Sequence, residues 1–173
     1  RCGAIARFSN VMASVIDFAN AGGKVLGVCN GFQILCESHL LPGVLLRNKD
    51  QKFICKNIHL RTETGNTILT GRLNEGDVLK IPIAHAEGRF HASDETLQEL
   101  IANDQILFKY CDENGNINEE SNFNGALHNI AGICNSGRNV FGMMPHPERA
   151  AEDILGNSDG LRILEGLMAG VGV

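Results

Sequence analysis

The stretch GVCNG, residues 27–31, contains the residue best suited to chemistry, a cysteine between two glycines. A short apolar run typical of a buried strand, residues 24–28, leads into it, and a helical pattern follows. The spacing is that of the G-x-S-x-G nucleophile elbow, with cysteine in place of serine. Such a strained strand-to-helix turn tolerates only very small neighbours two residues away on each side. We therefore predict that Cys29 is a nucleophile.

The helix expected after Cys29 also bears on its reactivity. Helix N-terminal amides and the positive end of the helix dipole lower the pKa of a nearby thiol and favour the thiolate. The main-chain amide of Asn30 is placed to donate a hydrogen bond to an oxyanion. Taken alone, the G-x-C-x-G pattern is equally compatible with an ordinary buried cysteine between two glycines.

A second chemical element is the stretch MMPHPERA, residues 143–150, which follows an apolar run. A cysteine nucleophile needs a histidine to take up its proton and later deliver it, and that histidine needs an acceptor to fix its tautomer. Glu148 can turn back onto the His146 imidazole, and the prolines on either side of the histidine stiffen the backbone. The alternative is a histidine in a surface turn beside a solvated glutamate. Together with the elbow, the pattern favours a triad of Cys29, His146 and Glu148.

Alternating helical and extended patterns predict the elements that must position these residues. A helix–strand–helix start followed by mixed strands indicates an α/β fold with a partly parallel sheet. Residues 135–139 separate two apolar runs and predict a hairpin turn, and Ser93 or Asp94 can cap a helix. The expected helices cover residues 10–21, 32–40, 93–102 and 159–168, and the expected strands cover residues 24–28, 51–62, 78–83, 105–110, 130–134 and 140–144.

The composition fits one domain over residues 1–173 and excludes several function classes. The chain is 43% apolar and carries a net charge of −5, which disfavours nucleic acid and anionic membranes as partners. No apolar run approaches the roughly 20 residues that span a bilayer. The six cysteines form no C-x-x-C pair and no zinc-knuckle spacing, so we expect no metal site and reduced thiols in the cytoplasm.

Several stretches together carry a family resemblance over residues 1 to about 167. They are GVCNGFQIL and MMPHPERA, the stretch IAHAEGRF at residues 83–90, LRN at 46–48, NG at 124–125 and NIAGI at 129–133. The chain resembles the class I (triad) glutamine amidotransferases and, within them, the glutaminase subunits of phosphoribosylformylglycinamidine synthase in purine biosynthesis. MMPHPERA and IAHAEGRF are the most specific of these stretches. The resemblance implies an open mixed, mainly parallel sheet flanked by helices.

The resemblance also implies a mechanism. Cys29 attacks the side-chain amide of L-glutamine, His146 acts as general base and then as general acid, and a γ-glutamyl thioester forms. Glu148 orients His146, and the Asn30 amide contributes to the oxyanion hole. By the same resemblance Gln33 contacts the bound glutamine, and the backbone from His85 to Gly88 holds its α-amino and carboxylate groups. A packing role for the His85 side chain stays open, because the family role rests largely on backbone.

Partners and cofactors follow from the same resemblance. Ammonia is expected to pass to a separate synthetase subunit that uses ATP and Mg²⁺, and a third small subunit joins the complex in many systems. This chain itself is expected to hold no cofactor and no metal. Two alternatives are a stand-alone cysteine hydrolase on the same scaffold, to which IAHAEGRF is foreign, and a non-catalytic interaction module.

Two departures from the family pattern stand out. Residues 123–126 are FNGA where the family usually has Pro-Asn-Gly-Ser, so a hydroxyl is absent at the last position. Family members also begin with a strand, a helix, a second strand and a glycine-rich loop ahead of the segment that matches Arg1. We therefore expect the chain to be truncated at its N-terminus, without those strands and without the second oxyanion amide. On that expectation, activity of the chain alone is uncertain.

Overall fold

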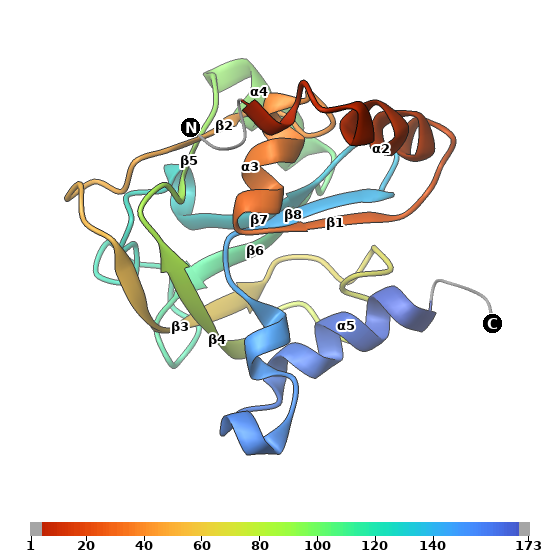
Figure 1. The fold of residues 1–173 in the computed structure, drawn as a ribbon. Coiled ribbons are helices and arrows are strands. Elements are labelled where there is room, and N and C mark those ends of the chain that lie inside the picture. The colour runs from red at the N-terminus through yellow and green to blue at the C-terminus, as the bar shows by residue number, and fades with distance from the viewer. Residues whose placement is uncertain (1–4, 170–173) are drawn as a thin grey trace.

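The computed structural model describes residues 5–169, in which a curled mixed sheet lies between helices (Figure 1). Helices α2 (Asn10–Asn20) and α3 (Asn30–Glu37) lie on one side of the sheet and α5 (Asp159–Ala169) on the other. In order across the sheet, the strands are β1 (Val25–Val28), β8 (Val140–Met143), β7 (Ile130–Cys134), β6 (Ile106–Cys111), β3 (Ile54–Thr62) and β4 (Val78–His85). The α/β class and the mixed sheet are therefore confirmed.

The parallel share of the sheet is smaller than the sequence indicated. Among the described strands of the six-stranded sheet, β1 and β8 pair in parallel, with Val28 opposite Met143, and the other four pairings are antiparallel. A short turn joins only one of these antiparallel pairs, β7 and β8, whereas the others are joined by longer segments or are not consecutive in the chain. Residues 135–139 form the predicted hairpin turn between β7 and β8. The elbow strand and the strand leading to His146 are thus the pair that runs side by side in one direction.

Most expected elements are present, with shifted ends. Helix α3 begins at Asn30 and ends at Glu37, and β4 extends to His85 with Pro82 inside it. Proline is tolerated there because β4 is an edge strand of the sheet. Ser93 is the N-cap of α4 (Asp94–Ala102), as expected. The sequence did not predict β2 (Val44–Leu46), β5 (Arg89–His91) or the short helices η1 (Leu127–Asn129), η2 (Pro147–Ala150) and η3 (Asp153–Leu155).

The core extends over both faces of the sheet, and its part between the sheet and α3 contains large, fully buried apolar side chains. Phe32 of α3 stacks against Phe90 of β5 with ring centroids 6.0 Å apart, which ties the small β2–β5 sheet to the helix. A Cβ at Gly142 of β8 would overlap the Phe32 ring, so a glycine at this position lets α3 approach the sheet. The elbow helix is thereby fixed against the strand that leads to His146. No helix within residues 5–169 is long and apolar enough to cross a membrane.

Candidate active site

The elbow has the conformation that its sequence predicts. Cys29 joins β1 to α3 with φ 52° and ψ −107°, a backbone region that non-glycine residues rarely occupy. A Cβ at Gly27 would lie 2.6 Å from the carbonyl carbon of Gly31, so the first glycine is required by contact with the backbone of the second. A Cβ at Gly31 itself would meet nothing within 4 Å. The steric demand for a small residue therefore falls on Gly27.

The Cys29 thiol is partly buried and faces β4. Its Sγ donates to the carbonyl oxygen of Ala84 at 3.8 Å. Burial raises the pKa of the thiol, and this outweighs the lowering by the Asn30 amide and by the Arg149 charge. The expectation of a net lowered pKa at the helix N-terminus was thus wrong for the chain without substrate, because desolvation is the larger effect. A thiol in this state needs a base before it can attack.

His146 and Glu148 form the expected pair. The Nδ1 atom of His146 lies 2.6 Å from Oε1 of Glu148, because the single turn of η2 brings the glutamate back onto the imidazole. The imidazole is nearly buried, whereas Glu148 is half exposed and has the Arg149 guanidinium 3.6 Å from the same oxygen. With Nδ1–H donating to the carboxylate, Nε2 presents its lone pair. This nitrogen is buried and has no partner among the described residues.

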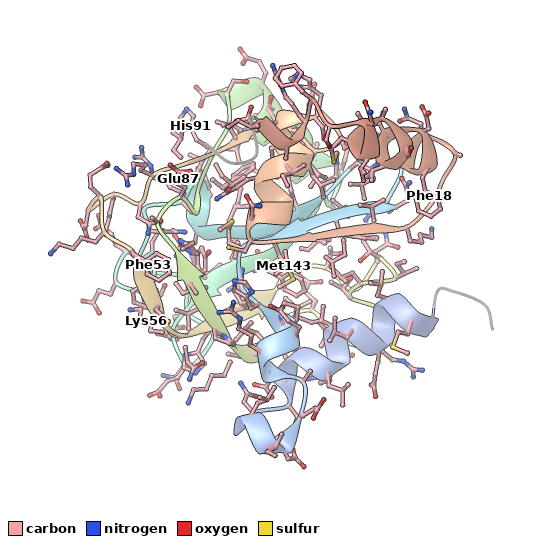
Figure 2. All side chains as sticks on the ribbon, in the orientation of Figure 1. Phe18, Phe53, Lys56, Glu87, His91 and Met143 are labelled. Atoms are coloured by element: carbon pink, nitrogen blue, oxygen red, sulfur yellow. The ribbon has the colours of Figure 1, made fainter. Side chains whose placement is uncertain are left out.

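The curled sheet brings the elbow and the histidine to one stretch of β4. Cys29 lies directly beyond the end of β1 and donates its N–H to the carbonyl of Met143 at 2.8 Å, at the end of neighbouring β8. The N–H of His146 donates to the carbonyl of Pro82 at 2.9 Å, two residues before Ala84, which accepts from the cysteine. In Figure 2, Met143 marks the end of β8 and Glu87 marks the loop that follows β4.

The predicted substrate-binding residues lie next to this stretch. Gln33, on the first turn of α3, donates its Nε2 to the carbonyl of Glu87 at 2.6 Å and so contacts the loop from His85 to Gly88. Asn30 is exposed at the start of α3, and its main-chain amide faces the Cys29 sulfur. These residues therefore lie on α3 and on the segment directly after Ala84, which accepts from the Cys29 thiol.

His85 and Gly88 are packed against each other. The His85 side chain is 3% exposed, and a Cβ on Gly88 would collide with its ring. Burial, and to a smaller extent the charge of His146, lower the pKa of His85 to about 4, so the ring is neutral near pH 7. Asn48 and Asn124 hold this pair, and sequence reasoning assigned neither of them a role in the site. Both nevertheless lie in stretches that carry the family resemblance.

The described residues contain no group of three or more His, Cys, Asp or Glu side chains that could hold a metal ion. The side chains that the elbow and the η2 turn bring to the site are a thiol, an imidazole and a carboxylate. In this arrangement they can carry out nucleophilic acyl transfer with proton transfer through the imidazole.

Comparison with known proteins gives one consistent family. Residues 3–159 match the family model of the CobB/CobQ-like glutamine amidotransferase domain. The chain is 54% identical to the phosphoribosylformylglycinamidine synthase subunit PurQ of Chlorobaculum parvum, over 98% of this chain and 67% of that protein. It is 55% identical to the subunit of the same name from Sulfurimonas denitrificans, over 97% of this chain and 74% of that protein.

The fold has a counterpart among solved structures. A chain in the structure of PurLQS from Thermotoga maritima superposes with a TM-score of 0.85 at 35% sequence identity. The superposition covers 99% of this chain and 73% of that chain.

Proposed function

This chain belongs to the family of the phosphoribosylformylglycinamidine synthase subunit PurQ, and we propose that it hydrolyses glutamine through a γ-glutamyl thioester on Cys29. As a member of this family it is the glutamine-hydrolysing subunit of a synthase of purine biosynthesis. The observation that supports the thioester route most directly is the shared strand. The Cys29 thiol and the His146 amide contact β4 carbonyls two residues apart, and Glu148 holds the imidazole.

The first half-reaction forms the thioester. His146 Nε2 takes the proton of the Cys29 thiol, and the sulfur attacks the side-chain carbonyl carbon of glutamine. The Asn30 amide stabilises the resulting oxyanion. The C–N bond then breaks as the imidazolium returns its proton to the leaving nitrogen, which departs as ammonia.

The second half-reaction releases glutamate. His146 Nε2 removes a proton from water, the hydroxyl attacks the thioester carbon, and the C–S bond breaks. The sulfur regains its proton from the imidazolium, which restores the starting state. Throughout, Glu148 keeps Nδ1 protonated and stabilises the imidazolium. We propose that Gln33 and the segment His85–Gly88 hold the amino-acid end of the glutamine.

The ammonia requires an acceptor, which we propose lies on a partner subunit. The related structure from Thermotoga maritima is of PurLQS. By analogy, this chain delivers ammonia to a synthetase subunit that uses ATP and Mg²⁺, with a third small subunit in the complex, and holds no cofactor of its own. We place the complex in the cytoplasm, and the free thiols of the five cysteines within the described residues fit that reducing compartment.

A chloroketone analogue of glutamine tests the proposal. The Cys29 sulfur would displace chloride and form a stable thioether, which mass analysis of peptides locates. We expect labelling at Cys29, protection by glutamine and no labelling in Cys29→Ser. Exposed Cys55 serves as the internal control, because a reagent that reacts by accessibility alone would modify it first.

The remaining outcomes discriminate the alternatives. Peptide hydrolysis without glutamine turnover would indicate a stand-alone cysteine hydrolase. Binding of the partner subunits by a chain that is never labelled, alone or in the complex, would indicate a non-catalytic module. Either result would overturn the proposal.

A further inference from the structure

Asn48 holds the loop that follows β4 through both ends of its side chain. The residue is fully buried. Its Nδ2 donates to the carbonyls of Lys52 at 2.8 Å and His85 at 2.9 Å. Its Oδ1 lies 3.0 Å from His85 Nδ1 and accepts the N–H of Gly88 at 3.2 Å. Its backbone N–H donates to the carbonyl of Ala86 at 2.9 Å.

Two further amides complete this support. Asn124, also buried, donates its Nδ2 to the carbonyl of Gly88 at 2.8 Å. Gln33 donates to the carbonyl of Glu87. Each carbonyl from His85 to Gly88 is therefore bonded to a donor from outside the segment. The loop beside Cys29 takes its conformation from these donors rather than from regular secondary structure.

The same contacts fix the tautomer of His85. The Asn48 amide can face only one way, because its nitrogen is committed to two carbonyls. The atom opposite His85 Nδ1 is thus an oxygen that only accepts, so Nδ1 carries the proton. The other ring nitrogen, Nε2, is left as a lone pair that is buried and without a partner among the described residues.

We propose that Asn48 is a positioning residue for glutamine binding, which preorganises the segment His85–Gly88 and holds His85 in the Nδ1–H form. The residue acts through this segment, which begins directly after the carbonyl that accepts from the Cys29 thiol. A misplaced segment would weaken substrate binding more than it would slow the chemistry. This inference rests on the proposed function, since it names what shapes the glutamine pocket of the same site.

The substitution Asn48→Asp separates the two ends of the side chain. Aspartate keeps the acceptors for His85 and Gly88 but cannot donate to the two carbonyls and repels them. Asn139→Asp is the matched control. Asn139 is also buried and donates Nδ2 to two carbonyls, those of Ala19 at 2.7 Å and Gly23 at 2.9 Å, at the end of β8 away from Cys29.

Glutamine hydrolysis by the complex with the partner subunits provides the kinetic test. For Asn48→Asp we expect the KM for glutamine to rise about tenfold or more while kcat changes by less than about threefold. The rate of Cys29 alkylation by iodoacetamide, which needs no glutamine pocket, should stay unchanged. Asn139→Asp should leave KM unchanged even if both variants melt at lower temperature. An unchanged KM in a folded Asn48→Asp variant overturns the inference.

The ¹⁵N chemical shifts of the His85 ring test the tautomer without any turnover. The wild-type chain should show a protonated Nδ1, and Asn48→Ala should allow the proton to move to Nε2. A wild-type ring protonated at Nε2 contradicts the inference, and this measurement stands even if every Asn48 variant fails to fold. If the wild-type complex hydrolyses no glutamine, the proposed function and this inference fall together. Hydrolysis with KM insensitive to Asn48→Asp removes the inference alone.

Discussion

At the residue scale, the site depends on where the proton of Cys29 goes. Burial holds the pKa of this thiol above its ordinary value, so few chains carry a thiolate at neutral pH in the absence of substrate. The lone pair of His146 Nε2 is the available acceptor, because Nδ1 is engaged with Glu148. In the proposed mechanism, the cysteine and the histidine therefore act together.

The substitution His146→Ala tests this dependence. We expect glutamine-dependent synthesis by the complex to fall by roughly 10³-fold or more, because thiolate formation and protonation of the leaving nitrogen both fail. Synthesis from added ammonia should be unaffected, because ammonia bypasses the glutaminase. Loss of both activities would contradict the division of labour between the subunits.

The charge of Arg149 lowers the pKa of Cys29, whereas burial raises it. Its positive charge favours the thiolate, so Arg149→Ala should raise the pKa of Cys29 further. The iodoacetamide alkylation rate of Cys29 follows the thiolate fraction, and its midpoint should move to higher pH in the variant. Arg138→Ala, on the distant hairpin turn, serves as the control and should leave the midpoint in place. A midpoint that is unchanged or lower in Arg149→Ala would refute this electrostatic role.

At the element scale, the elbow depends on the close approach of β1 and α3. Gly27 lies against the backbone of Gly31, whereas Gly31 has open space where its own side chain would be. The sequence pattern predicts the same steric need for a small residue at both glycines, whereas the structure shows this need at Gly27 and not at Gly31.

A pair of alanine substitutions measures this asymmetry. Gly27→Ala should lower the free energy of unfolding by about 2 kcal/mol or more, since the strand and helix must move apart. Gly31→Ala should be neutral or stabilising by up to about 1 kcal/mol, because alanine favours the helix. Urea unfolding of both variants decides the matter, and equal losses would refute the asymmetry.

The elements that could be predicted are those with a strong hydrophobic period. The strands from Ile106 to Cys111 and from Ile130 to Cys134 were predicted to within a residue or so, because both consist of apolar runs bounded by turns. Strands β2 and β5 were missed, since three residues each carry no measurable period and their pairing joins distant parts of the chain. The contacts of Asn48 could not be predicted for the same reason, because they join residues that are distant in the sequence.

At the scale of the whole molecule, the antiparallel part of the sheet contains ion pairs whose contribution to stability depends on pH. Glu63 follows β3 and accepts from Arg61 at 2.7 Å and from Lys109 of β6 at 2.9 Å. Burial alone would raise the pKa of this carboxyl, but the hydrogen bonds and charges of the two cations outweigh burial and lower the pKa below its ordinary value. A carboxyl whose pKa is lower in the folded than in the unfolded chain stabilises the fold at pH values above its unfolded-state pKa. This stabilisation is lost as the pH falls through the folded-state pKa.

Glu63→Gln should therefore lower the free energy of unfolding by about 1 kcal/mol at neutral pH, a value kept small by partial exposure of the ion pairs. The difference from wild type should shrink as the pH falls from the ordinary pKa of a glutamate toward the lower pKa of the folded carboxyl, because the wild-type contribution is lost across this range. Urea unfolding curves at neutral and acidic pH measure both quantities. A difference that grows on acidification would show that the sign is wrong.

The elbow at Cys29 and the pairing of His146 with Glu148 could be anticipated from sequence, because each lies within a short local motif. The convergence of those motifs could not, since it depends on the curl that carries the end of β4 round to β1 and β8. Carbonyls of Pro82 and Ala84 provide that meeting point, and main-chain groups leave no mark in a sequence pattern. The large share of antiparallel pairing was likewise hidden, because it follows from which strands meet.

The covalent state of Cys29 during turnover tests the central claim most directly. The complex would be quenched in acid while it hydrolyses glutamine, and the masses of the peptides of this chain would be measured by mass spectrometry. We expect one γ-glutamyl group on Cys29, sensitive to hydroxylamine as a thioester must be, and none on Cys55. Turnover of glutamine with Cys29 unmodified, or with the adduct on another residue, would contradict it.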